Sequence, residues 1–201
     1  MSSQDPLFSP NEFNCLNDKD FLLTKIEVTT KIVTLLGKVE QALAPAINAN
    51  SWPNQVLAKS GKISKGEMYE GLPYFILDFP RYFHKENVFA FRTLCWWGNF
   101  FSSTLHLSGS YLEDTRGNLI SATESIIASN AYICVNENPW EYHYRPNNYL
   151  AADQFDQNQL AALFNARAFI KISHKWGLEA YAHLPQLVVN SFQQTISWLN
   201  A

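Results

Sequence analysis

The sequence predicts an α+β fold, in which an antiparallel sheet of about five strands packs against an N-terminal helix and a C-terminal helical pair. Apolar, aromatic-rich runs separated by turn signals fill residues 71–109, which is typical of consecutive strands. Residues 19–43 and the C-terminal third have the three-to-four-residue apolar spacing of amphipathic helices. A chain of 201 residues that is 47% hydrophobic and 16% charged has the size and composition of a single domain.

The N-terminal third is expected to be an arm, a helix and a connection. Residues 1–17 are polar and contain two prolines, so we expect an irregular arm. Over residues 19–43 the apolar periodicity predicts an amphipathic helix. Pro45 is expected to stop this helix at or before Ala44. Residues 48–70, with three lysines, are expected to be a long polar connection.

Three consecutive strands are expected over residues 72–79, 88–97 and 100–108. The first is nearly all apolar, and Pro80 is expected to end it. Gly98-Asn99 predicts a two-residue turn between the second and third strands.

The C-terminal half is expected to contain two short strands and two helices. Residues 118–129 are open to helix or strand, and their apolar spacing slightly favours a helix. Residues 132–135 and 140–144 have the pattern of two strands joined by the sequence NENP. A helix capped by Asp156 is expected to run to about Trp176, with a last helix beginning near Pro185.

Charge and motifs exclude several classes of function. The net charge is −3 and no basic block is present, so we expect no nucleic-acid partner. No apolar run approaches the ~18 residues of a membrane span, and the N-terminus lacks a signal-peptide pattern, so a cytoplasmic location without membrane contact is expected. The three cysteines and five histidines lack the spacing of a metal site. We therefore expect no metal and no cofactor.

The predicted turn defines a candidate ligand-binding face. A two-residue turn pairs positions whose numbers sum to 197, and alternation then places the following side chains on one face: Phe91, Thr93, Trp97, Thr104 and His106. An aromatic-rimmed face with polar groups suits a small ligand, but an ordinary solvent-facing or subunit-covered sheet face has the same pattern.

The same pairing places Arg92 on the opposite, more apolar face, which we expect to pack against the helices. It also separates Cys95 from His106 by roughly 13 Å, too far for a thiolate–imidazole pair.

Arg92 requires a partner, because its guanidinium remains charged among apolar neighbours. Asp78 is the obvious carboxylate, although the tightest register of residues 72–79 would place it on the other face. Two interpretations therefore stay open. The charges form one or two fold-fixing ion pairs, for which Asp78 with Arg81 is a candidate, or Arg92 belongs to an anionic-ligand site.

Residues 63–109, with the segments ISKGEMYEG, LDFPRYF and FRTLCWWGNFFSSTLHLSG, resemble an uncharacterised group of bacterial proteins. The resemblance implies a bacterial cytoplasmic protein and no particular chemistry.

Aromatic residues make up 14% of the chain, and no catalytic constellation accompanies them. We therefore expect a non-enzymatic binding protein or a self-associating interaction protein, whose partner is a further copy of the same chain in a homo-oligomer. The alternative is a small-molecule-binding protein or enzyme with a pocket on the Thr93/Thr104/His106 face.

Overall fold

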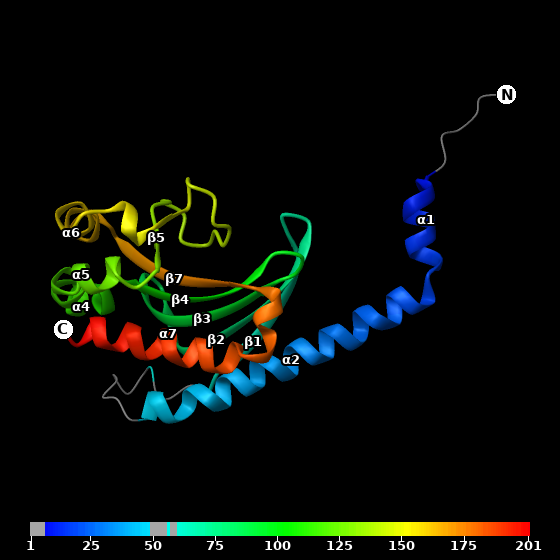
Figure 1. The fold of residues 1–201 in the computed structure, drawn as a ribbon, viewed down its shortest axis with the longest axis horizontal. Helices are drawn as coiled ribbons and strands as arrows, with labels where there is room; N and C mark the ends of the chain where they lie inside the picture. Colours follow the sequence, from blue (N-terminus) through cyan, green and yellow to red (C-terminus); the bar gives the residue numbers. More distant parts are fainter. Residues whose placement is uncertain (1–6, 49–55, 57–59) are drawn as a thin grey trace.

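The computed structural model describes residues 7–48, Val56 and 60–201. Within these residues the fold is α+β, with an antiparallel sheet of seven strands where the sequence predicted about five (Figure 1). The strand order is β1-β2-β3-β4-β7-β5-β6. The elements, with 3-10 helices as η, are α1 Pro10–Asn17, α2 Lys19–Asn48, β1 Lys62–Tyr69, β2 Leu72–His84, β3 Asn87–Trp96, β4 Phe100–Ser108, α4 Ser110–Ser121, α5 Thr123–Ile127, β5 Tyr132–Cys134, β6 Tyr149–Ala151, η1 Ala152–Gln154, α6 Gln157–Ala166, β7 Phe169–Gly177, η2 Leu178–Ala182 and α7 Leu184–Leu199.

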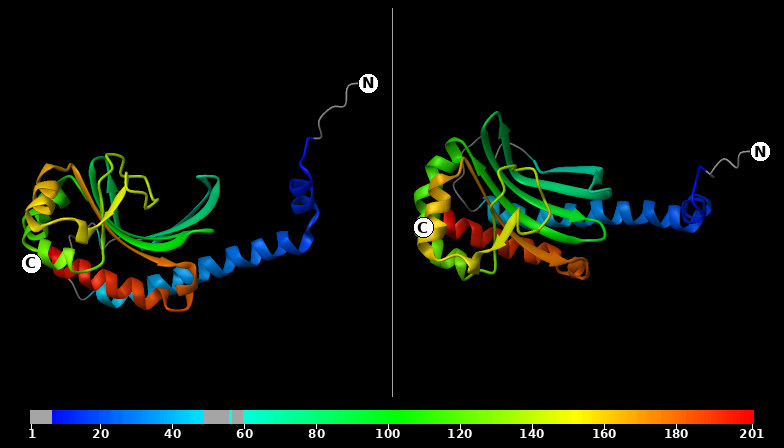
Figure 2. Two further views of the ribbon diagram at one scale, coloured as in Figure 1. Left: turned by 45° about the horizontal axis from the view of Figure 1, so that its top comes forward. Right: turned by 90° about the horizontal axis from the view of Figure 1, so that it is seen from above.

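The sheet is curved and its two faces are covered differently. Helices α2 and α7 lie side by side under one face, which we call the helix face (Figures 1 and 2). Residues 135–148 form a long loop over the opposite, concave face. Helices α4, α5 and α6 gather at the end of the sheet where the C-terminus lies, and α1 lies at the far end of α2 (Figure 1). Among the described residues, no helix is both long and apolar enough to cross a membrane.

The prediction of an irregular arm is wrong for residues 10–17, which form α1. Ser9 and Glu12 make a reciprocal capping box, and Pro10 takes the first helical turn, where its missing N–H costs nothing. Residues 1–6 lie outside the described residues.

Helix α2 continues past Pro45 to Asn48, at least four residues beyond the stop that we expected. The side chains of Leu36, Val39, Leu43 and Ile47 are all buried at helical spacing. Burial on both sides of Pro45 therefore holds the last turn although the proline removes one hydrogen-bond donor.

Residues 48–70 are not one polar connection, because residues 62–69 form the edge strand β1. This strand pairs with β2, and its three charged side chains, Lys62, Lys65 and Glu67, are exposed. Charges on an edge strand discourage pairing with other chains, and they also conceal the strand pattern in the sequence. Residues 49–55 and 57–59 lie outside the described residues.

Strand β2 does not end at Pro80 but runs to His84. The pairing of β2 with β3 is irregular between Asp78 and Arg81, and proline is tolerated at such a bulge because no ladder donor is needed there.

The turn between β3 and β4 has three residues, so the predicted pairing is wrong by one position. Paired residues sum to 196, with Trp96 opposite Phe100. Gly98 adopts a positive φ of 69°, and the Trp97 N–H donates to the Pro73 carbonyl on β2 at 3.0 Å. Trp97 has therefore left the β3–β4 ladder. A slip of one residue moves the side chains of one strand to the other face relative to its neighbour.

The C-terminal third is not wholly helical. Residues 157–166 form α6 behind the Asp156 cap, but residues 169–177 form β7, which lies between β4 and β5 in the sheet. The last helix begins at Leu184, next to Pro185, as predicted.

Residues 118–121 belong to α4 and residues 123–127 to α5, so most of the segment 118–129 is helical, as the apolar spacing favoured. The expected strand over residues 140–144 is absent, since these residues belong to the loop. Strand β5 pairs with β6 and with β7.

Candidate functional site

The five residues of the predicted ligand-binding face do not share a face. Phe91 is buried on the helix face, where its ring lies 5.0 Å from that of Phe192 on α7. Thr93 is buried there too, and Trp97 stacks on Phe75 of the same core. Thr104 and His106 belong to the concave face, as explained below.

The prediction that Arg92 faces the helices is also wrong. Arg92 pairs with Thr104 in the β3–β4 ladder and neighbours Ala90, which pairs with His106. The single-residue shift in register therefore brings Arg92 onto the face of Thr104 and His106, from which the sequence had separated it.

Asp78 is the partner of Arg92. The two residues are directly paired between β2 and β3, and Arg92 Nε and Nη2 donate to the two carboxylate oxygens at 2.7 and 3.0 Å. Burial alone would lower the pKa of Arg92, but the hydrogen bonds and charge of Asp78 outweigh it, so this pKa is raised. Arg81 instead donates to the Ser60 carbonyl at 3.2 Å. Of the two open interpretations, the geometry supports the fold-fixing ion pair.

The loop of residues 135–148 is bonded to this polar layer. Tyr142 accepts a hydrogen bond from Arg92 Nη1 at 2.9 Å. Lys171 of β7 donates from Nζ to the carbonyls of Pro139 and Glu141, both at 2.8 Å. Buried cations thus face tyrosine hydroxyl and carbonyl oxygens that the loop supplies, which satisfies their donors inside the protein.

Burial shifts the titration of two facing groups. It lowers the pKa of Lys171 to about 8. His106, opposite Lys171 in the β4–β7 ladder, has its pKa lowered to about 3 by burial and then by the charges of Lys171 and Arg92. Its ring lies 5.5 Å from that of Trp140 in the loop. Histidine at this position is therefore neutral under ordinary conditions.

Tyr69 at the end of β1 holds the loop at a second point. Its hydroxyl donates to the Glu141 carboxylate at 2.9 Å and accepts from the backbone N–H groups of Tyr142 and His143 at 2.9 and 3.1 Å. Burial raises the pKa of Tyr69 to about 12. Beside it, Arg145 of the loop forms an ion pair with Glu70.

The cavity beneath the loop measures about 10 Å³. This is close to the smallest volume that holds one water molecule. The polar layer around Arg92 is thus filled by the chain's own loop, and what it can do is anchor that loop to the sheet.

A buried hydroxyl–imidazole chain on the helix face was not predicted. The Ser191 hydroxyl of α7 lies 2.7 Å from that of Ser103 on β4 and 2.9 Å from Nδ1 of His174 on β7. The imidazole is stacked between Trp176 and Trp198, with centroids 6.3 and 6.1 Å away. The chain joins α7 to two strands. Because its members are far apart in sequence, no local pattern reveals it.

A larger groove opens where α2 emerges from under the sheet, at the β3–β4 turn and η2. Its volume is about 570 Å³, within the usual range for binding pockets. The lining is mainly apolar: Val28, Ile32 and Leu35 of α2, Cys95, Trp97 and Phe101 around the turn, and Leu178 and Tyr181 of η2, with Lys31, Thr34, Lys38 and Gly98.

Cys95 and His106 are on opposite faces of the sheet, and burial raises the pKa of Cys95 to about 12. The thiol is therefore protonated and does not form the reactive thiolate that a nucleophile requires.

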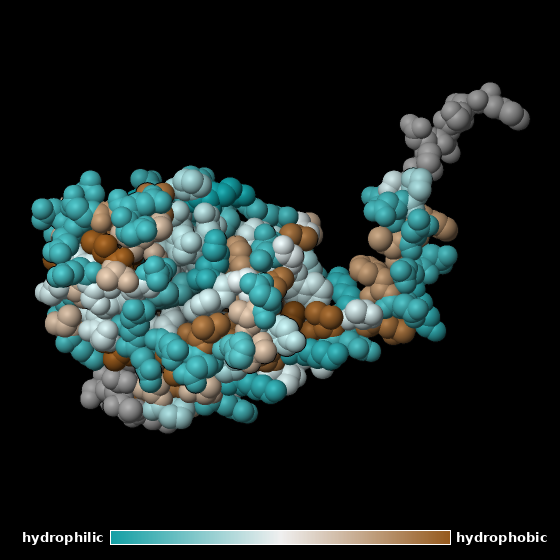
Figure 3. All heavy atoms as spheres, viewed as in Figure 1, coloured by the Kyte–Doolittle hydropathy of each residue, from teal (hydrophilic) through white to brown (hydrophobic). Residues whose placement is uncertain are grey.

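The N-terminal part of the chain projects from the body of the protein (Figures 1 and 2). We define the projecting arm as residues 7–33, which comprise α1 and the first half of α2. Every residue from 7 to 28 is exposed. Large apolar side chains of the arm are nevertheless numerous: Leu7, Phe8, Phe13, Leu16, Phe21, Leu22, Leu23, Ile26, Val28 and Val33 are each at least 37% exposed. Apolar residues recur along the arm and where it joins the body (Figure 3).

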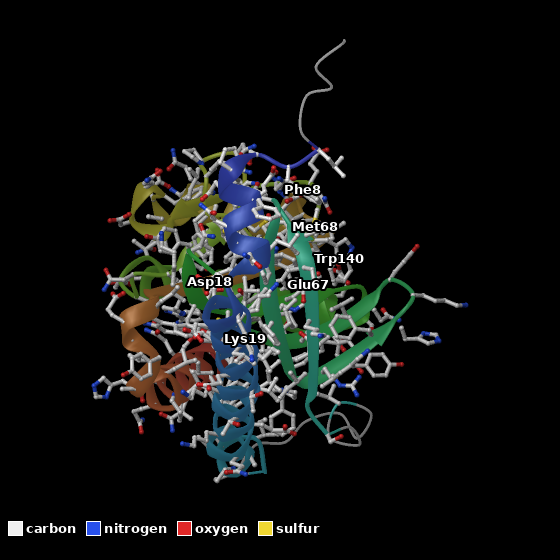
Figure 4. The ribbon with its side chains drawn as sticks, turned by 90° about the vertical axis from the view of Figure 1, so that its right-hand side faces the viewer. Phe8, Asp18, Lys19, Glu67, Met68 and Trp140 are labelled. Atoms are coloured by element: carbon white, nitrogen blue, oxygen red, sulfur yellow. The ribbon has the colours of Figure 1, made fainter. Side chains whose placement is uncertain are left out.

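The bend between α1 and α2 lies at Asp18, whose carboxylate accepts the Phe21 N–H at 2.9 Å (Figure 4). Lys25 of the arm lies 3.8 Å from Glu67 of β1. The sequence contained the apolar periodicity of α2, but that periodicity predicts burial equally for both halves of the helix.

Across residues 7–48, 56 and 60–201, no group of three or more His, Cys, Asp or Glu side chains is arranged to hold a metal ion. Comparisons of the chain with family models, with curated proteins and with solved structures give no match.

Proposed function

We propose that this protein is a non-enzymatic interaction protein that self-associates through its projecting arm. The observation that carries the proposal is the exposure of residues 7–28 in a segment that is rich in large apolar side chains. A concentration of exposed large apolar side chains on a protein marks an interaction site.

The exposed apolar area matches what an interface needs. Ten large apolar side chains of the arm are 37–88% exposed. Fully burying one such side chain removes on the order of 100 Å² of apolar surface from water, so the ten present on the order of 500 Å². A standard interface buries about 800 Å² per partner, of which about 56–58% is apolar. The arm of one copy thus offers enough apolar surface for a specific dimer.

Helix stability supports the same conclusion. Most of the stability of a helix in a protein comes from packing its apolar face, and a helix in water is marginal by itself. The first half of α2 has its apolar face in solvent, whereas the second half buries Leu36, Val39 and Leu43 completely. A second copy supplies the missing packing, since a two-fold axis brings the same surface of both copies together.

The alternative function, a small-molecule pocket on the Thr93/Thr104/His106 face, has less support. Thr93 lies on the other face of the sheet from Thr104 and His106. The space beside the latter two is about 10 Å³, too small for a metabolite.

Sedimentation velocity of the full chain at increasing concentration tests the proposal. We expect the 23.0-kDa chain to form a species of twice that mass. The double variant Leu22→Ser/Ile26→Ser should raise the dimer dissociation constant by at least tenfold, because it removes apolar surface at the centre of the arm.

The matched control is Leu22→Met/Ile26→Leu, which keeps both positions apolar and should keep the dimer. Circular dichroism verifies that both variants are folded. A monomer at every concentration, or a dimer that the serine variant leaves unchanged, would contradict the proposal.

A further inference from the structure

The groove between α2 and the β3–β4 turn is open, although its walls are apolar. Its volume of about 570 Å³ is walled by Ile32 and Leu35 of α2 on one side and by Trp97 and Phe101 on the other. Lys31 and Lys38 also line it and are exposed. The groove is therefore suited to an apolar helix that carries negative charge.

The chain cannot fill this groove with its own α1. One wall of the groove is α2 itself, and residues 19–28 of that continuous helix separate α1 from the first wall residue, Val28. At 1.5 Å per residue this is about 14 Å of rigid helix. Helix α1 accordingly lies at the far end of the arm, away from the body of the protein (Figures 1 and 2).

The exposed surface of α1 complements the groove in chemistry. Phe13 and Leu16 are 55% and 58% exposed, and no residue of α1 is buried. Glu12 and the following Asp18 are its charged groups, and residues 9–18 contain no lysine or arginine. The acidic side chains at the two ends of α1, Glu12 and Asp18, and its exposed apolar side chains thus complement the apolar walls and the lysines of the groove, of which Lys31 also pairs with Glu27 of its own helix at 3.7 Å.

We propose that the groove of each copy binds α1 of a second copy. The inference rests on the proposed self-association through the arm and names its contact.

Two-fold geometry places the parts together. If two arms pair antiparallel about Ile26, Lys19 of one copy lies beside Val33 of the other, because both are seven residues from the centre. Asp18, at the end of α1, then lies beside Thr34, which lines the groove of the other copy. The exchange is reciprocal, so both grooves are filled and the assembly closes as a dimer.

Cysteine cross-linking tests this contact. Cys15 on α1 is exposed, whereas Cys95 and Cys134 are buried. In the variant Lys38→Cys, a short bismaleimide should join Cys15 of one copy to the introduced cysteine of the other and give a covalent dimer in denaturing gels. The wild-type chain and the variant Asn158→Cys, which places the thiol on exposed α6, are the controls and should give no covalent dimer.

Changing the charges of the two groove lysines tests the same contact. The variant Lys31→Glu/Lys38→Glu should raise the dimer dissociation constant on the order of tenfold by placing acid against acid. The variant Lys31→Gln/Lys38→Gln should have a smaller effect.

The outcomes separate the two proposals. A dimer that depends on Leu22 and Ile26 but gives no Cys15 cross-link at Lys38→Cys overturns the groove assignment and leaves the arm interface standing. A monomer at every concentration overturns both. Binding of dodecanoate in the groove of an intact dimer, detected by tryptophan fluorescence and lost in Ile32→Glu, would show that α1 does not occupy the groove and would also overturn the assignment.

Discussion

Arg92 and Asp78 form an ion pair between the sheet and the loop of residues 135–148. Their side chains are 15% and 8% exposed, respectively. In Asp78→Asn the guanidinium keeps its charge but loses its carboxylate. We expect a loss of about 3–5 kcal/mol in unfolding free energy, which is typical of breaking a buried ion pair from one side. Urea denaturation at neutral pH measures it.

Two variants serve as controls for this ion pair. Glu70→Gln breaks the more exposed pair with Arg145 and should cost much less, because solvent screens that pair. Asp78→Leu/Arg92→Met removes both charges and should recover much of the loss. An Asp78→Asn protein as stable as wild type would contradict the interpretation that this ion pair fixes the fold.

His106 makes stability depend on pH in a defined window. Its pKa is about 3 in the folded protein, against 6.5 for an exposed ring. Between these values the unfolded chain binds a proton that the folded chain does not, so stability falls as the pH is lowered from 6.5 towards 3. The expected slope from this residue is about 1.4 kcal/mol per pH unit.

The variant His106→Asn should lack the contribution of His106 to the pH dependence of the unfolding free energy, which corresponds to the uptake of one proton on unfolding. Urea denaturation of both proteins between pH 7 and pH 4.5 isolates the difference. The other buried imidazoles and the carboxylates contribute equally to both proteins and cancel. Equal slopes would show that His106 titrates normally, in an open environment.

At the scale of elements, one anchor of the loop of residues 135–148 is the Tyr69 side chain, which comes from a strand distant in the sequence. In Tyr69→Phe, two backbone N–H groups and a carboxylate lose the hydroxyl that they share. Leaving such groups unpaired costs about 1–3 kcal/mol. Hydrogen exchange of the amides of residues 142 and 143 should become faster, while exchange in β4 stays unchanged.

Tyr181→Phe is the control, since Tyr181 is 62% exposed on η2. Unchanged exchange of the loop amides in Tyr69→Phe would show that the loop is held without this hydroxyl.

For the whole molecule, self-association links stability to concentration. A partner that binds the folded arm stabilises the folded state by mass action. The Tm of the wild-type chain should therefore rise with protein concentration, and that of Leu22→Ser/Ile26→Ser should not. Differential scanning calorimetry at several concentrations measures both. A wild-type Tm that is independent of concentration would be inconsistent with an obligate dimer.

Parts of the fold that local chemistry decides could be predicted from the sequence. Strand β4 has the bounds that its apolar run and the Gly98-Asn99 signal predicted, and α7 begins beside Pro185. The α+β class also follows from local patterns. Turn residues and apolar spacing act over a few positions, so the structure that they favour can be predicted without the rest of the chain.

Strand β7 was missed because two periodicities coincide. Leu160, Phe164, Ala168 and Ile172 continue a helical stripe, yet from residue 169 the chain alternates between faces. Only the position between β4 and β5, which offers ladder partners on both sides, decides for the strand.

By itself, the sequence determined the class of fold, the apolar material of the sheet and the need of Arg92 for a carboxylate. Only the tertiary structure decided which faces meet. The Trp97 N–H donates to the Pro73 carbonyl on a third strand and not within the hairpin, whose register differs by one residue from the predicted one and places Arg92 on the face of Thr104 and His106. The exposure of the arm is also decided by the tertiary structure. An amphipathic pattern indicates which side of a helix is apolar, but it does not indicate whether another element covers that side.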